Sequence, residues 1–158
     1  TLLPAINQGA NGSLTAIMNT ACAVGFGSVV KVVPGFTLLK NAMLNMPGSI
    51  LFSEAVAVNV LAGATGSASG GMSIALEALA PQYLEKALAI GLNPEYLHRI
   101  ASLASGGLDT LPHNGAVLTL LAVSNCTHKE SYLDVCVTSC IIPVIASLVL
   151  SLVWGLFV

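Results

Sequence analysis

Charged residues are scarce in this sequence. Its 158 residues include five Lys or Arg and seven Asp or Glu, 8% in all, and the formal net charge is -2 at pH 7. A soluble domain has about 25% charged residues, so this chain has too few to cover a surface in contact with water. The lack of a basic patch also argues against a nucleic-acid partner.

Signatures of metal binding and catalysis are missing too. The four cysteines form no CxxC pair and no Cys/His cluster at metal-ligand spacing. We therefore expect no metal site and no cofactor. No GxSxG elbow and no HExxH motif occur, and the serines of the GSASG run at 66–70 stand out of register for the elbow. We expect no enzyme, although a membrane-embedded enzyme and a purely structural scaffold are the alternatives from other classes.

Apolar residues dominate the sequence. They make up 55% of it, the mean hydropathy is +0.87, and the stretches 1–30, 55–76 and 135–158 contain no charged residue. A transmembrane helix needs about 20 apolar residues, and no strand-like alternation is visible. The sequence thus predicts an all-α, multi-pass integral membrane protein in contact with the lipid bilayer. Because it begins at Thr1 within an apolar pattern, we expect the C-terminal portion of a longer protein.

Glycine and proline divide the chain into four helical units. They are 1–33, a first span after a loop at 1–13; 49–80, a helical hairpin; 94–124, a broken helix; and 131–158, the last span. A short amphipathic link at 35–46 joins the first two units.

Local signals support these boundaries. Asn93, Pro94 and Glu95 favour a helix start, and Thr127 with Glu130 fits a capping box. In the last span we expect a kink at Pro143.

Polar segments interrupt two of the four units. In 49–80 two short arms flank 65–71, and we expect the second arm to end at Pro81; in 94–124 the arms flank 106–115. Unpaired backbone in the bilayer core costs several kcal/mol, so a break there must line a polar cavity or pack against protein. Transporters use such breaks, because half-helix N-termini attract an anion and unpaired carbonyls attract a cation.

Other interpretations of these segments stay open. Small residues at 63–71 also favour tight helix packing, and 105–115 also fits a surface loop. Against the loop, the arms 95–105 and 116–124 are each too short to cross a bilayer.

Ionisable residues within a membrane indicate function. Asp109 and His113 are the candidates for binding and releasing a proton, because a histidine titrates near about pH 6.5 and an aspartate near about pH 3.9 in water. Glu54 and Glu77 also lie in apolar arms, where each could face protein or reach toward the interface. Hydrogen-bonding side chains near the breaks are those of Ser67, Ser69, Thr110 and Asn114.

Several strings resemble one known family. These are LLPAINQGANGS, NTACAVGFGSVV, GSASGGMSIALEAL and ASGGLDTLPHNGAVLTLLAVSNCTHKESY. They look like the C-terminal third of gluconate:proton symporters (GntP-type permeases) of the ion transporter superfamily, and the similarity covers nearly the whole chain. The resemblance implies the second half of an inverted-repeat transporter, with a re-entrant hairpin (49–80, tip Thr65–Gly71) and a broken transmembrane helix (94–124, interrupted at Gly106–Gly115).

The resemblance also implies a function. We expect proton-coupled symport of a small organic anion, a gluconate-like sugar acid or hydroxy acid, across the inner (plasma) membrane; the alternative is a sodium-coupled carboxylate transporter of the same architecture. Substrate contacts would fall on Ser67, Ser69, Thr110 and Asn114, and proton coupling on Asp109 and His113. The missing N-terminal repeat would be a partner, and homo-oligomer formation stays open.

The orientation in the membrane stays open as well. The hairpin interpretation places four cations on one side, Lys31, Lys40, Lys86 and Arg99, and Lys129 on the other. The positive-inside rule makes the first side cytoplasmic, whereas the superfamily analogy makes it external.

Overall fold

A computed structural model describes residues 2–157, with the backbone alone for residues 5, 8, 15, 16, 19, 20, 23, 24, 27 and 31. Within this range the chain is helical and has no strand, which confirms the expected all-α class. The elements are α1 Leu2–Val32, α2 Pro34–Leu44, α3 Ile50–Thr65, α4 Ala68–Ala89, α5 Pro94–Ser105, the 3-10 turn η1 Leu108–Thr110, α6 Gly115–Ser124, α7 His128–Cys136, the π-helical η2 Val137–Ile141 and α8 Ile142–Leu156.

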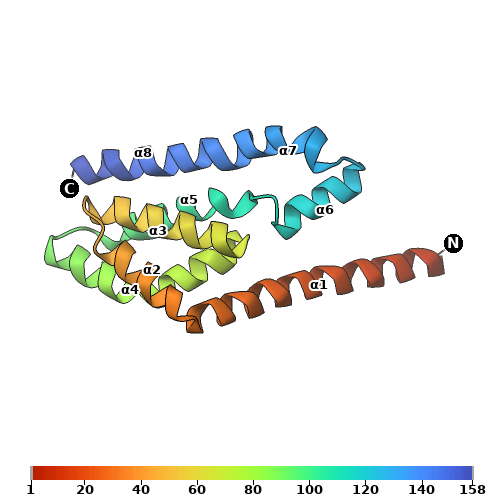
Figure 1. Cartoon of the computed structure of the whole chain (residues 1–158), viewed down its shortest axis with the longest axis horizontal. Coiled ribbons are helices and arrows are strands. Elements are labelled where there is room, and N and C mark those ends of the chain that lie inside the picture. The colour runs from red at the N-terminus through yellow and green to blue at the C-terminus, as the bar shows by residue number, and fades with distance from the viewer. Residues whose placement is uncertain (1, 158) are drawn as a thin grey trace.

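Helix α3 forms the centre of the bundle. It packs against α4, α5 and α8, and α4 also packs against α5. In Figure 1 the α7–α8 helix runs along one edge, while α1 extends away from the bundle and the two chain ends lie at opposite sides. Eleven of the sixteen α3 residues are buried. A helix that is apolar around its whole circumference is a core helix, which matches this position.

The hairpin of α3 and α4 turns over two residues. Gly66 ends α3 in the left-handed region (φ 59°, ψ 33°), and Ser67 caps α4 by accepting a hydrogen bond from Gly70 N at 3.1 Å. The break is therefore shorter than the predicted 65–71, because 68–71 is already helical. A side chain at Gly71 would collide with the backbone of Ala62. Tight helix packing thus accounts for the small residues after the turn.

The prediction that Pro81 ends the second arm is wrong, because α4 continues through it to Ala89. A proline inside a helix costs about 3 kcal/mol. Pro81 is exposed, but Leu79 and Tyr83 on either side of it are buried. Packing of the buried face therefore holds the helix across the missing hydrogen bond.

The predicted loop at 1–13 is also wrong, because α1 begins at Leu2. Pro4 lies in the first turn, where a helix needs no N–H donor. Glycine costs a helix only about 1 kcal/mol relative to alanine, so the glycines at 9 and 12 do not prevent a helix that satisfies its own backbone hydrogen bonds.

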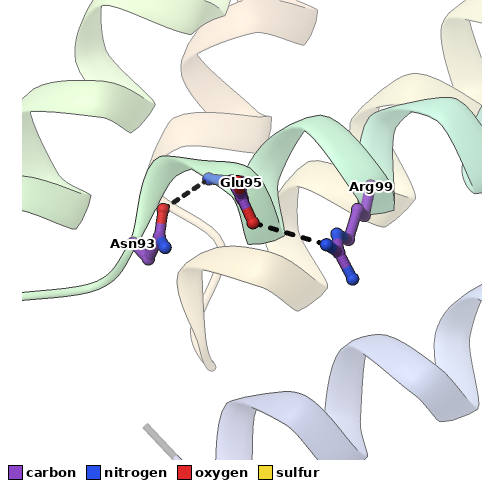
Figure 2. A network of polar contacts seen from close by, with 3 residues as sticks. All are labelled: Asn93, Glu95 and Arg99. Carbon is purple, nitrogen blue, oxygen red and sulfur yellow. Dashed lines mark hydrogen bonds and ion pairs between the residues drawn. The ribbon is translucent and has the colours of Figure 1, made fainter.

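Both predicted helix starts are confirmed. Figure 2 shows Asn93 accepting from the Glu95 amide at 3.0 Å, with Arg99 paired to the Glu95 carboxylate at 3.3 Å. The capping box is present as well, since the Glu130 carboxylate accepts from Thr127 N at 2.8 Å.

Helix length and hydropathy determine which of these segments can cross a bilayer. The stretch His128–Leu156 has 29 residues, and its apolar 18-residue window has a mean hydropathy of 2.4; within the described range it is the one helix that is long and apolar enough to span. The arms α5 and α6 have 12 and 10 residues. At 1.5 Å per residue they measure about 18 and 15 Å, well short of a hydrocarbon core of about 30 Å.

Candidate functional site

The hairpin tip and the second break lie side by side. Asn114 donates from Nδ2 to Gly66 O at 2.8 Å, and His113 Nε2 lies 3.1 Å from Gly63 O. Turn η1 also packs against α3. Segments about 50 residues apart in the sequence thus form one site, built on the rigid hairpin.

Asn114 joins the two segments with its whole side-chain amide. Nδ2 donates to Gly66 O and to Asp109 O, both at 2.8 Å, while Oδ1 accepts from Ala116 N at 2.6 Å and Val117 N at 3.0 Å. An amide has two N–H donors and two acceptor lone pairs, so none is left over. In this arrangement Asn114 caps α6 and fastens the break to the hairpin tip, and it is buried.

Thr110 ties the same break to the last helix. Its hydroxyl donates to Ser139 O at 2.8 Å and lies 3.1 Å from Cys140 Sγ, and its carbonyl accepts from Tyr132 OH at 3.3 Å. The hydroxyl thus already has protein partners. The break is held from the hairpin side by Asn114 and from the last-helix side by Thr110.

Pro143 explains why a carbonyl of the last helix is available to Thr110. In an α-helix the carbonyl of Ser139 would accept from the amide four residues later, but residue 143 is a proline without an N–H. A π-helical segment, in which Ile142 N donates to Val137 O, covers this region. Bulges of this kind are frequent at functional sites. Pro143 itself lies in the first turn of α8, directly after this segment, and the kink expected there stays a prediction.

Glycines allow the chain segments to approach this closely. A methyl group at Gly63 would lie 2.8 Å from Leu108 Cβ, and one at Gly66 would lie 2.7 Å from His113 Cδ2. At Gly107 it would collide with the side-chain oxygen of Asn59. The glycines on both sides of the site are therefore required by contact between segments as well as by turn geometry.

The two predicted proton-coupling residues differ in their surroundings. Asp109 is half-buried in η1, and its Oδ1 has no hydrogen-bond donor among the described residues. His113 is exposed and uses one ring nitrogen on the Gly63 carbonyl. If Nε2 carries the hydrogen, it donates to that carbonyl and leaves Nδ1 as the basic atom.

The two predicted serines lie at the start of α4. Ser67 is half-buried and Ser69 exposed, and their hydroxyl oxygens are 3.5 Å apart. Because Asn114 bonds to Gly66, the first turns of α4 and α6 are close to each other. The first amides of a helix have no partner within it, and each N-terminus carries a partial positive charge. Two such ends therefore meet here.

Asn59 is a residue that the sequence analysis missed. It is 3% exposed, its Nδ2 donates to Ala55 O at 2.9 Å and Ser147 Oγ at 3.1 Å, and its Oδ1 has no donor among the described residues. An asparagine inside an apolar helical arm could have indicated a buried contact between segments, since buried polar groups need hydrogen-bond partners. It connects the hairpin to α8 beneath the break.

Groups of three or more His, Cys, Asp or Glu that could hold a metal ion do not occur among the described residues.

Comparison with known proteins gives one informative match. Over 130 residues, 82% of its length, the chain is 50% identical to a Bacillus subtilis (strain 168) protein named "Uncharacterized transporter YxjC". The matched region is 28% of that relative's length, so the chain spans a little over a quarter of it. No protein-family model matches the chain, and no solved structure does. The similarity to gluconate:proton symporters thus stays a prediction.

Proposed function

We propose that the chain forms a solute-binding half of a secondary active transporter, which carries a small organic anion together with a proton across the inner membrane. The observation that carries the proposal is the pair of helix interruptions joined by Asn114. It is supported by the 50% identity to a protein named a transporter. The missing N-terminal repeat would complete the binding site, and no catalytic step or cofactor is involved.

In this proposal the hairpin is re-entrant, the α5–α6 unit crosses the bilayer as a broken helix, and the protein is multi-pass. Neither α5 nor α6 alone has the length to span. Together they do, provided that the break lies near mid-depth. The broken backbone would then be tolerated because it packs against the hairpin tip rather than against lipid.

The anion would bind where α4 and α6 begin. Their N-termini carry partial positive charge, and Ser67 and Ser69 add hydroxyl donors. A carboxylate is the natural ligand for such a pair of ends, which fits a sugar acid or a hydroxy acid. Thr110 and Asn114, the other two predicted substrate residues, would act by holding the break in place, because their polar atoms already bond to protein.

Proton coupling would use Asp109 and His113. The Asp109 carboxylate has an oxygen without a donor, and the imidazole of His113 lies on the hairpin carbonyl. Protonation of either group would change the charge next to the bound anion, so solute and proton would favour each other's binding.

A sodium-coupled carrier of the same architecture is the second candidate. The observation that favours it is the pair of buried side-chain oxygens without donors, Asn59 Oδ1 and Asp109 Oδ1. Oxygen ligands of this kind suit a hard cation.

The test is uptake of radiolabelled gluconate into proteoliposomes that contain the complete permease carrying this segment. Under the proposal an inward acid gradient drives uptake, Asp109→Asn abolishes that drive, and Asp134→Asn, which removes an exposed carboxylate of α7, has no effect. Uptake that is independent of the acid gradient but requires sodium would favour the sodium-coupled carrier over the proton-coupled one. Normal uptake by both Asp109→Asn and His113→Ala would contradict the roles of these residues.

A further inference from the structure

A second carboxylate lies in the interior, away from the site described above. Glu54 belongs to the first turns of α3 and is 3% exposed, and its Oε2 has no hydrogen-bond donor among the residues that the structure describes. Thr65 at the hairpin tip lies eleven positions further along the same helix, which is about 16 Å. Glu54 therefore cannot touch a solute held at the tip.

A groove between α4 and α5 leads to this carboxyl group. The groove has a volume of about 670 Å³, and Glu54 is one of its lining residues. Its walls are mainly apolar, with Met72, Leu76 and Leu84 from α4 and Leu97 and Ala101 from α5. Leu76 and Leu84 are partly exposed, so the groove opens at the surface of the described structure.

The structure gives Glu54 no ion-pair partner among the side chains that it describes. On the groove, α4 contributes Glu77 and Tyr83, and α5 contributes His98. The Tyr83 hydroxyl is shared with Ser53 Oγ at 2.9 Å. Helix α8 has no titratable residue, and within the described part of the chain Glu54 forms no ion pair with Lys40 of α2 or with another residue.

An ionised carboxylate in such a place would be costly. Removing an isolated carboxylate from water carries a large free-energy cost even after the protein relaxes, and no basic partner among the described side chains offsets it. Binding of one proton converts the carboxylate to a neutral carboxylic acid, which avoids this cost. The groove is the opening that connects this carboxyl group with the surface of the described structure.

We propose that Glu54 is a proton-binding site, separate from the solute site, that exchanges its proton through the groove between α4 and α5. The proton is held as the O–H of a neutral carboxylic acid, and its loss leaves a carboxylate on α3 facing the groove. Since α3 runs from Glu54 to the hairpin tip as one rigid helix, the change in charge acts on its packing against α4 and α5. The use of this proton to drive uptake rests on the proposed transport function, but the site itself does not.

Infrared spectroscopy of the protein in lipid tests the site directly. At neutral pH the C=O stretch of a protonated carboxylic acid is expected, and it should disappear on alkaline titration and be absent from Glu54→Gln. The matched control Glu77→Gln, at the exposed rim of the same groove, should keep the band. Carbon-13 labelling of glutamate in the wild-type chain separates Glu54 from aspartates without a substitution, in case Glu54→Gln does not fold. A wild-type spectrum without a protonated glutamate band, or a band that persists in a folded Glu54→Gln, overturns the proposal.

Transport assays test the use of the proton. Proteoliposomes that contain the complete permease are loaded with unlabelled gluconate. The entry of labelled gluconate in exchange for it is then measured without a pH gradient. Glu54→Gln should retain this exchange but show no added accumulation under an inward acid gradient. Accumulation equal to wild type would refute a role in driving transport. A wild-type protein without exchange would contradict the proposed function, while the infrared result would still decide the proton site.

Discussion

Replacement of Asn114 by alanine is expected to separate the two breaks and to cost about 3 kcal/mol of stability. The estimate follows from the bonds that the side-chain amide makes. Loss of the cap on α6, formed with Ala116 N and Val117 N, costs about 1 kcal/mol. The two bonds from Nδ2 to Gly66 O and Asp109 O contribute about 1 kcal/mol each.

A serine at position 114 separates these contributions. Serine is a good cap but has no amide to reach both carbonyls, so Asn114→Ser should lose about 2 kcal/mol. Asn45 provides a matched control, because its Nδ2 also donates to a carbonyl at 2.8 Å but on the exposed surface of α2. We expect Asn45→Ala to change stability by no more than about 0.5 kcal/mol.

The measurement is denaturant unfolding in detergent micelles, followed by circular dichroism and extrapolated linearly to zero denaturant. Hydrogen exchange of the amides at 116 and 117 gives a local readout: exchange should accelerate in Asn114→Ala and stay slow in Asn114→Ser. If Asn114→Ala unfolds at the same free energy as Asn45→Ala, the amide does not join the breaks and the site built on it is refuted.

Three further predictions concern the packing around the site, each measured by the same unfolding assay. Gly66→Ala should lower the free energy of unfolding more than Gly91→Ala. Both glycines have positive φ, but only a methyl group at position 66 would meet an imidazole. If both variants lose the same amount, about 1–2 kcal/mol, backbone strain alone explains the loss and the contact with His113 contributes nothing. Gly71→Ala should destabilise by about 1–3 kcal/mol through overpacking on the facing arm, whereas Gly9→Ala in open space should be neutral or stabilise by up to about 1 kcal/mol. Thr110→Val should lose about 1 kcal/mol that Thr110→Ser retains, since the hydroxyl donates to the last helix; equal stability of the two variants would contradict that bond.

Features encoded locally were predictable from the sequence. The cap at Asn93, the capping box at Thr127 and the interruption at 106–115 depend on residues a few positions apart, and each occurs as expected. The same local reasoning failed at Pro81 and at residues 1–13. There the energetic cost of proline or glycine was outweighed by packing of the opposite helix face or by the helix's own backbone hydrogen bonds.

The partners of the site residues were less predictable, because they come from distant parts of the chain. The sequence identified Asn114 and Thr110 as polar residues in a break. It did not reveal the carbonyls that accept their hydrogen bonds, Gly66 O and Ser139 O, because these are 48 and 29 residues away. A polar residue in a break can contact a solute or hold the break. Only the packing shows which protein groups they contact, and here both residues bond to backbone carbonyls of neighbouring segments.

The two breaks are held in different ways, and this difference bears on how the site could move. The hairpin turn is fixed by backbone contacts, since α3 and α4 pack so closely that Gly71 has no room for a side chain. The second break also packs against α3, but polar side chains hold its ends: Asn114 fastens it to the hairpin, and Thr110 fastens it to a carbonyl that Pro143 leaves without its helical partner. Side-chain hydrogen bonds of this kind contribute about 1 kcal/mol each, so they can exchange partners at low cost. A change in the break can therefore reach the last helix through Thr110 while the hairpin stays rigid.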